Sequence, residues 1–131
     1  MPNIMLTAQF QNAEFASSER EQGLEHLRSL GTLIPEPAVL TAEHAPDLIA
    51  SIASSSVYTD EFYAAAEDLR IVARWGVGFD KVNIPGATRY GVIITVTPVH
   101  MDAVAEYAIA QWMATLKPPL PQRRLLHHPH L

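Results

Sequence analysis

Short apolar runs alternate along most of the chain with stretches of helical periodicity. Five apolar runs are typical of strands, at residues 4–10, 32–40, 49–53, 69–73 and 92–96. The second run contains Pro35 and Pro37, which indicate a strand at the edge of a sheet. Between the first two runs, Ser18 begins a stretch in which leucines recur at helical spacing until Gly31 ends it.

Residues suited to capping a helix predict three more helices. Thr41 caps a short helix through Leu48, Thr59 caps a helix through Ala66, and Asn83 with Pro85 begins a helix that Gly91 ends. Because strands and helices alternate, we expect right-handed crossovers and an α/β fold built on a doubly wound, parallel, five-stranded sheet. Of the two common strand orders, we favour 2-1-3-4-5.

A last helix is expected at residues 102–116. Its apolar positions form a broad face that needs a partner, and we expect a homo-oligomer through this helix. The residues of that face are Ala105, Ala108, Ile109, Trp112, Met113 and Leu116. Residues 117–131 contain four prolines without periodicity and are interpreted as a frayed tail.

Composition narrows the class of protein. The 131 residues carry a formal net charge of −5 and no run of Lys or Arg, which argues against nucleic acid or an anionic membrane as partner. The absence of cysteine excludes disulfides and thiolate metal sites. No apolar run approaches the ~20 residues that span a bilayer, and the first residues lack a signal-peptide pattern, so we expect a cytoplasmic protein.

The segment RWGVGFD, residues 74–80, directly follows the fourth predicted strand. Gly76 and Gly78 allow the backbone to approach a ligand, and outward-facing amides around Val77 would form a nest for a small carboxylate. The alternative is an ordinary tight turn. A dinucleotide fingerprint is excluded, because Lys81 stands at the third glycine position and Pro85 prevents a long helix from opening at the loop.

The segment LRIVARWGVGFDKVNIPGATRYGVIITVTP, followed by DAVAEYAIAQWMATL, resembles the centre of the D-isomer-specific 2-hydroxyacid dehydrogenases. That family shows a strand, R-x-G-x-G-x-D, a short helix, a strand ending in T-P, and a helix opening with V-A-E. All of these elements occur in the same order between residues 69 and 116. The resemblance implies a flavodoxin-like substrate domain at residues 1–99, a linker helix at 100–116 and a tail at 117–131.

The resemblance also implies a substrate site at the loop. The amides of Val77 and Gly78 would bind the substrate carboxylate at the turn that Gly76 makes. Trp75 and Phe79 would wall that pocket, or would serve only in packing. Outside the loop, His100 would lie on the cleft side.

Arg74 and Asp80 match positions of the motif that are interpreted as structural. Arg74 would pair with a nearby carboxylate, and Asp80 would hydrogen-bond the backbone of the loop. In the last helix, Val104 would face the nicotinamide of the cofactor, and Glu106 would be a structural hydrogen-bonding residue.

Two positions depart from the family pattern. Asn83 stands where the family often has Asp, and it remains a good helix cap. The loop VHMDA, residues 99–103, is one residue shorter than the usual spacing, which puts a normal cleft geometry in doubt.

In the family, the NAD- or NADP-binding motif, the substrate-gripping Arg and the catalytic His–Glu pair follow the V-A-E helix. We therefore predict a truncated chain that has no catalytic residue and binds no cofactor by itself. The alternatives are a free-standing binding or interaction module and a gene product without function.

Other chemistries find little support in the sequence. A magnesium-binding receiver domain shares the expected strand order, but it needs acidic residues at the end of the first strand, which here is IMLTAQF. The motif G-x-S-x-G is absent, and no Ser or Thr stands in a recognisable nucleophile setting. His127, His128 and His130 match no structured metal site, and no metal site is predicted.

Overall fold

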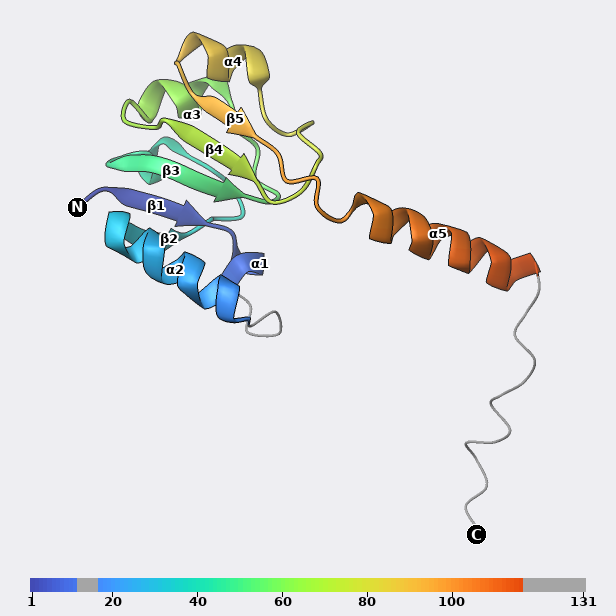
Figure 1. Ribbon diagram of the computed structural model, residues 1–131. Coiled ribbons are helices and arrows are strands. Elements are labelled where there is room, and N and C mark those ends of the chain that lie inside the picture. Colours follow the sequence, from blue (N-terminus) through green and yellow to red (C-terminus); the bar gives the residue numbers. More distant parts are fainter. Residues whose placement is uncertain (12–16, 117–131) are drawn as a thin grey trace. The chain divides into compact units, whose positions relative to one another are not determined.

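The computed structural model describes residues 1–11 and 17–116, and the chain divides into two compact units, Met1–Thr97 and Pro98–Leu131. The first unit holds a parallel sheet of five strands in the order β2-β1-β3-β4-β5 (Figure 1). Its strands are β1 (Asn3–Leu6), β2 (Thr32–Pro35), β3 (Leu48–Ala53), β4 (Ile71–Arg74) and β5 (Ile93–Thr95). The predicted α/β class and strand order are therefore confirmed.

Helices lie on both faces of the sheet. In Figure 1, α2 covers one face near β1 and β2, whereas α3 and α4 lie together on the other. The helical elements of this unit are α1 (Ala8–Gln11), α2 (Ser18–Leu30), the 3-10 helix η2 (Ala42–His44), α3 (Asp60–Ala65) and α4 (Ile84–Arg89).

Side-chain caps fix where three of these helices begin. The Ser17 hydroxyl accepts a hydrogen bond from the Arg20 amide at 3.2 Å, one residue ahead of the predicted cap. The predicted caps Thr59 and Asn83 are confirmed, because each side chain accepts a backbone amide in the first turn of its helix. Each cap satisfies one of the amides that a helix start leaves without a partner.

Three predicted boundaries are wrong. The second strand, expected at residues 32–40, ends at Pro35. Residues 8–10 are helical rather than extended, because the ladder ends when the Thr7 amide bonds the Ile52 carbonyl and the chain then turns. The segment after Thr41 forms only η2, not a helix through Leu48. Pro46 has no amide hydrogen with which to continue the helix, and Asp47 has a φ of 58°, a left-handed turn that sends the chain into β3.

The main core fills the space between the sheet and the α3–α4 side. Tyr58, Phe62, Tyr63 and Val72 are all buried there, and the Tyr58 ring meets Phe62 edge-on at 5.6 Å between centroids. The Tyr58 hydroxyl shares a buried hydrogen bond of 2.7 Å with Ser51 on β3. This bond ties the core aromatics to the middle of the sheet.

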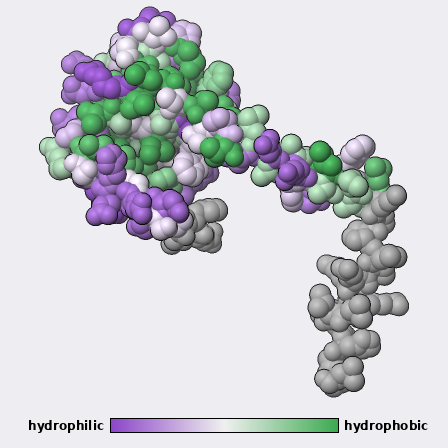
Figure 2. Space-filling view, in the orientation of Figure 1, coloured by the Kyte–Doolittle hydropathy of each residue, from purple (hydrophilic) through white to green (hydrophobic). Residues whose placement is uncertain are grey.

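The opposite face of the sheet is covered unevenly within the first unit. Strand pairing aligns Ile4, Ala50, Ile71 and Ile93 in one row across β1, β3, β4 and β5. Ile4 is 2% exposed where α2 lies above β1, whereas Ile93 on the edge strand is 61% exposed. In Figure 2, hydrophobic residues gather over the part of the sheet that α2 does not cover, next to the polar surface of α2. The sheet face is thus apolar beyond the part that α2 covers.

The second unit contains α5 (Met101–Leu116), in which no residue is buried. Its exposed apolar side chains are not confined to one stripe, since Val104, Tyr107, Ile109 and Trp112 point in different directions around the axis. At 16 residues it is too short to cross a membrane, and no other helix of the described residues is long and apolar enough to do so.

Two core tyrosines should respond in opposite ways to loss of the hydroxyl. Among the described side chains, the Tyr63 hydroxyl is the buried polar atom without a partner, so Tyr63→Phe should raise the free energy of unfolding by about 1 kcal/mol. Tyr58→Phe should lower it by about 1–3 kcal/mol, because Ser51 then loses its buried partner. Urea denaturation checks both signs, and equal effects would contradict this account of the core.

The burial of Tyr63 also makes the stability of the fold depend on pH. Burial raises the pKa of Tyr63 from 10.0 to about 12. The unfolded chain therefore ionises first, so the free energy of unfolding falls as pH rises from about 10 towards 12. Tyr63→Phe should lose less stability over that range than the parent chain, measured by urea denaturation at a series of alkaline pH values.

Candidate functional site

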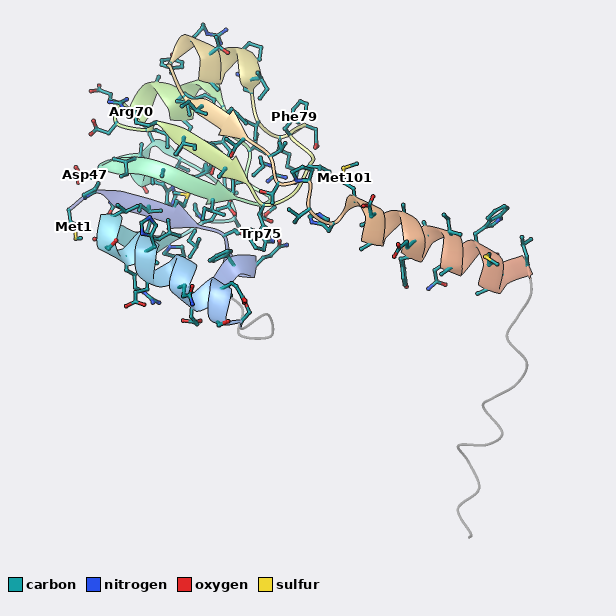
Figure 3. The ribbon with its side chains drawn as sticks, viewed as in Figure 1. Met1, Asp47, Arg70, Trp75, Phe79 and Met101 are labelled. Carbon is teal, nitrogen blue, oxygen red and sulfur yellow. The ribbon has the colours of Figure 1, made fainter. Side chains whose placement is uncertain are left out.

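The loop that follows β4 stands at the carboxyl end of the sheet. Gly76 has a φ of +135°, a backbone conformation that residues with a Cβ rarely adopt. Trp75 and Phe79 lie at the end of the sheet opposite Asp47 and Arg70, and they diverge, Trp75 towards α1 and Phe79 towards α4 (Figure 3). Between the two aromatic residues, Val77 and Gly78 are exposed.

Arg74 holds the loop from inside. Its Nε donates to the Gly78 carbonyl at 2.7 Å, and its Nη1 donates to the Ala53 carbonyl at 3.0 Å and to the Ser54 carbonyl. The expected carboxylate partner is therefore wrong: the guanidinium binds backbone carbonyls at the end of β3 and on the far side of its own loop. The structural role itself agrees with the prediction, because these bonds close the loop.

Thr97 provides a second clamp that the sequence reasoning did not foresee. Its hydroxyl donates to the Arg74 carbonyl at 3.0 Å, and its amide donates to the Gly76 carbonyl at 2.9 Å. The T-P pair that ends the strand motif was the available signal, but nothing in the sequence showed that it reached the glycine loop. Together, Arg74 and Thr97 occupy the carbonyl groups of Arg74, Gly76 and Gly78.

The amides of the loop divide into paired and free groups. The Trp75 amide donates to Ala53 at 2.8 Å, and the Gly76 amide donates to Arg74 at 3.0 Å. Across residues 1–11 and 17–116, the amides of Val77 and Gly78 donate no hydrogen bond. The loop therefore presents two consecutive donors, on a backbone that two side chains and a strand end hold in place.

Asp80 does not hydrogen-bond the loop backbone as expected. No donor within the described residues reaches its carboxylate, and its Oδ1 lies 3.4 Å from the position that a Cβ on Gly78 would occupy. The neighbouring Lys81 is turned away, with its Nζ donating to the Ser55 carbonyl at 3.2 Å. With Arg74 and Asp80 of opposite sign, the attraction of the loop for an anion comes from amide dipoles rather than from net charge.

Two hollows adjoin the aromatic residues of the loop. Trp75 and Phe10 line a hollow of about 340 Å³, with ring centroids 4.9 Å apart in an edge-to-face arrangement. Phe79 and Ile84 line one of about 370 Å³ beside α4 and β5. Both aromatic residues therefore combine packing with an open apolar surface. Neither hollow is lined by Val77 or Gly78, which are exposed and stand between Trp75 and Phe79 in the sequence of the loop.

The other predicted site residues belong to the second unit. His100 and Val104 are both exposed, and the Val104 amide donates to the His100 carbonyl at 3.1 Å at the start of α5. Glu106 is exposed on the same helix. A substrate contact for His100 and a cofactor contact for Val104 remain predictions.

The residues at the loop do not fit a dinucleotide. A pyrophosphate site needs a long helix opening at the glycines, whereas α4 begins at Ile84 and has six residues. No three His, Asp or Glu side chains come together as metal ligands in the part of the chain that the structure describes. The tail histidines lie outside that part.

Comparison with known proteins identifies relatives of this arrangement. The model of the D-isomer specific 2-hydroxyacid dehydrogenase catalytic domain matches residues 15–117. A glyoxylate reductase of Thermococcus kodakarensis is 35% identical over 98 residues, which are 74% of this chain and 27% of the relative. A D-3-phosphoglycerate dehydrogenase of Synechocystis sp. is 37% identical over 62 residues, 47% of this chain and 11% of the relative.

A solved structure shows the same relationship in three dimensions. The NADPH-dependent glyoxylate/hydroxypyruvate reductase of Sinorhizobium meliloti, in complex with NADP and malonate, superposes with a TM-score of 0.59 at 26% identity. The match covers 87% of this chain and 34% of that protein. The chain thus spans about a third or less of the length of these relatives.

Gly76 and Gly23 offer a matched pair of substitutions. An added Cβ meets no atom within 4 Å at either position, but only Gly76 has a left-handed φ. Gly76→Ala should therefore lower the free energy of unfolding by about 1–3 kcal/mol or displace the loop. Gly23→Ala, inside α2, should raise it by about 0.5–1 kcal/mol. Thermal unfolding tests the pair, and a neutral Gly76→Ala with unchanged amide NMR signals at Val77 would contradict the strained turn.

Proposed function

The chain belongs to the D-isomer specific 2-hydroxyacid dehydrogenase family, and we propose that its glycine loop binds the carboxylate of a small 2-hydroxy or 2-oxo acid. The proposal rests on the amides of Val77 and Gly78, which donate no hydrogen bond to any of the residues that the structure describes. A carboxylate has two oxygens with several lone pairs, so each amide can donate to it. No side-chain cation is needed for this contact.

The rigidity of the loop supports this role over that of an ordinary turn. A simple turn needs only its own backbone bond, whereas this loop is held by the Arg74 guanidinium and by Thr97. Donors that are already oriented lose less entropy when a ligand binds. The malonate in the Sinorhizobium meliloti complex shows that a relative of this family takes a small carboxylate.

Hydride transfer in this family uses a nicotinamide cofactor, for which the described residues of the loop offer no site. The Sinorhizobium meliloti relative is described with NADP, but the loop of this chain does not fit a dinucleotide. We infer that the chain contributes the substrate-carboxylate half of a cleft, and that dehydrogenase activity with NAD or NADP depends on further residues. Purified alone and mixed with NADH and 2-oxo acids, the chain should not oxidise NADH. The absorbance of NADH at 340 nm is followed, and a complete relative serves as the positive control.

Binding to the loop should depend on the charge of the ligand. Glycolate should move the amide NMR signals of Val77 and Gly78, with a dissociation constant of order millimolar, because only two exposed charge-assisted bonds form. Glycolamide has the same size but no charge, and it should bind about tenfold more weakly. Titration of ¹⁵N-labelled chain distinguishes the two. Equal shifts from both ligands, or shifts spread over the whole surface, would rule out a carboxylate site.

Thr97 provides the matched control. Thr97→Val removes the hydroxyl that donates to the Arg74 carbonyl but keeps the backbone bond to Gly76, so glycolate should bind more weakly. Thr97→Ser keeps the hydroxyl and should bind like the parent. Thr95→Val, at the end of β5, should leave the affinity for glycolate unchanged, because the Thr95 side chain makes no hydrogen bond within the described residues.

The apolar surface of α5 favours a second candidate function, self-association. A helix that is apolar around its axis is normally covered, and α5 leaves Ile109 and Trp112 55% and 64% exposed. We propose that two copies of the chain associate through residues 102–116. This assembly is independent of the carboxylate site.

Charged substitutions test that assembly. Ile109→Lys combined with Trp112→Lys should convert a dimer or larger species into a monomer, because two cations would have to be desolvated at the interface. Val39→Lys changes a 71% exposed apolar residue of the first unit and should leave the assembly intact. Analytical ultracentrifugation gives the mass, and a parent chain that remains monomeric at high concentration would refute the proposal.

A further inference from the structure

We propose that the hollow between Phe10 and Trp75 receives the substituent of the bound acid, and that this substituent is neutral and apolar. The inference rests on the proposed carboxylate site, since it adds a second contact to the same ligand. It therefore names the class of substrate: 2-hydroxy or 2-oxo acids with an aromatic or branched hydrocarbon side chain.

The hollow shares a wall with the loop. Trp75 immediately precedes Gly76, and its backbone amide is fixed to the Ala53 carbonyl at 2.8 Å. Its ring reaches towards α1 (Figure 3) and meets the Phe10 ring at an interplanar angle of 89°. The lining consists of Gln9, Phe10, Ser17, Glu19, Arg20 and Trp75. Trp75 is thus the residue that links the hollow to the loop, two positions before Val77 in the chain.

The size and surface of the hollow suit a hydrocarbon group. A closed apolar cavity of about 150 Å³ already holds benzene, and this open hollow measures about 340 Å³. The exposed surface is mostly apolar, and Trp75 is 45% exposed. An aromatic or branched substituent would cover that ring and gain from removal of apolar surface from water.

The charges around the hollow disfavour an anionic substituent. Arg20 is the cation of the lining, but its Nε donates to the Phe10 carbonyl at 2.8 Å and its Nη1 pairs with Glu21 at 2.9 Å. A backbone hydrogen bond, together with the hydroxyls of Ser17 and Ser18, holds the pKa of Glu19 below its ordinary value, so this carboxylate stays charged at neutral pH. A phosphate placed here would face Glu19, and the only cation among the described lining residues is already engaged by these two bonds.

These features separate the chain from two of its relatives by substrate class. A relative named glyoxylate reductase acts on an acid without a carbon substituent, which would leave the hollow empty. A relative named D-3-phosphoglycerate dehydrogenase acts on an acid with a phosphate, which the charges here oppose. The hollow instead fits a substituent that neither name implies.

The experiment reads the two contacts separately. The chain has two tryptophans, so Trp112→Phe leaves Trp75 as the source of the indole N–H signal in ¹⁵N NMR. D-Phenyllactate, glycolate and D-3-phosphoglycerate are titrated into this variant. D-Phenyllactate should bind about tenfold more tightly than glycolate and should move both the indole and the Val77 and Gly78 amide signals. Glycolate should move the amides and leave the indole in place.

Three variants test the hollow itself. Phe10→Ala removes the ring that faces Trp75 and should cut the preference for D-phenyllactate from about tenfold to less than about threefold, with glycolate unchanged. Gln9→Trp alters an exposed position, does not threaten the core, and should fill the hollow with the same effect. Phe79→Ala, at the other hollow, should keep the full preference. Thermal melts confirm that each variant is folded.

The outcomes are distinct. If glycolate and D-phenyllactate bind equally, or if Gln9→Trp keeps the preference, the hollow plays no part and the carboxylate site still stands. If D-3-phosphoglycerate binds most tightly, the substituent is anionic and the inference is wrong. If none of the three acids moves the Val77 and Gly78 amides, the proposed function fails, and this inference fails with it.

Discussion

The contact between the Arg74 guanidinium and the carbonyl groups around it is the constraint on which the site depends. The side chain starts at the end of β4, reaches the carbonyls of Ala53 and Ser54 at the end of β3, and returns to the carbonyl of Gly78. A guanidinium suits this task because its donors are planar, permanently charged and directed to several sides. Because Arg74 binds only carbonyl oxygens, the amides of Val77 and Gly78, which donate to none of the described residues, remain free to donate to a ligand.

The order of elements could be predicted because each strand and helix carries its own local signal. Apolar runs mark the buried strands, and caps such as Thr59 and Asn83 mark where helices begin. Boundaries failed where a tertiary constraint overrides the pattern. Phe10 continues an apolar run, but the ladder ends at Thr7 and the chain turns there. Leu48 looked like the end of a helix, but it pairs with Asn3 in the sheet.

The glycine loop was predictable as a turn, but its partners were not. Its glycines and position after a strand indicated exposed amides, whereas the Thr97 clamp joins residues 23 apart in sequence. The hollow between Phe10 and Trp75 is still less visible in the sequence, because the two rings are far apart along the chain. Such contacts depend on how the folded chain brings distant segments together, and a local sequence pattern does not record this.

The solvent exposure of the loop decides how strongly these residues can act alone. Two amides that face water exchange one set of hydrogen bonds for another when an acid binds, so the net gain is small. The same two donors become stronger in a site from which water is excluded, because the effective dielectric constant falls. This chain spans 27% of one relative and 34% of another, and Val77 and Gly78 of its loop are exposed. Any group that covered the loop would therefore strengthen the same two hydrogen bonds without a change in the backbone.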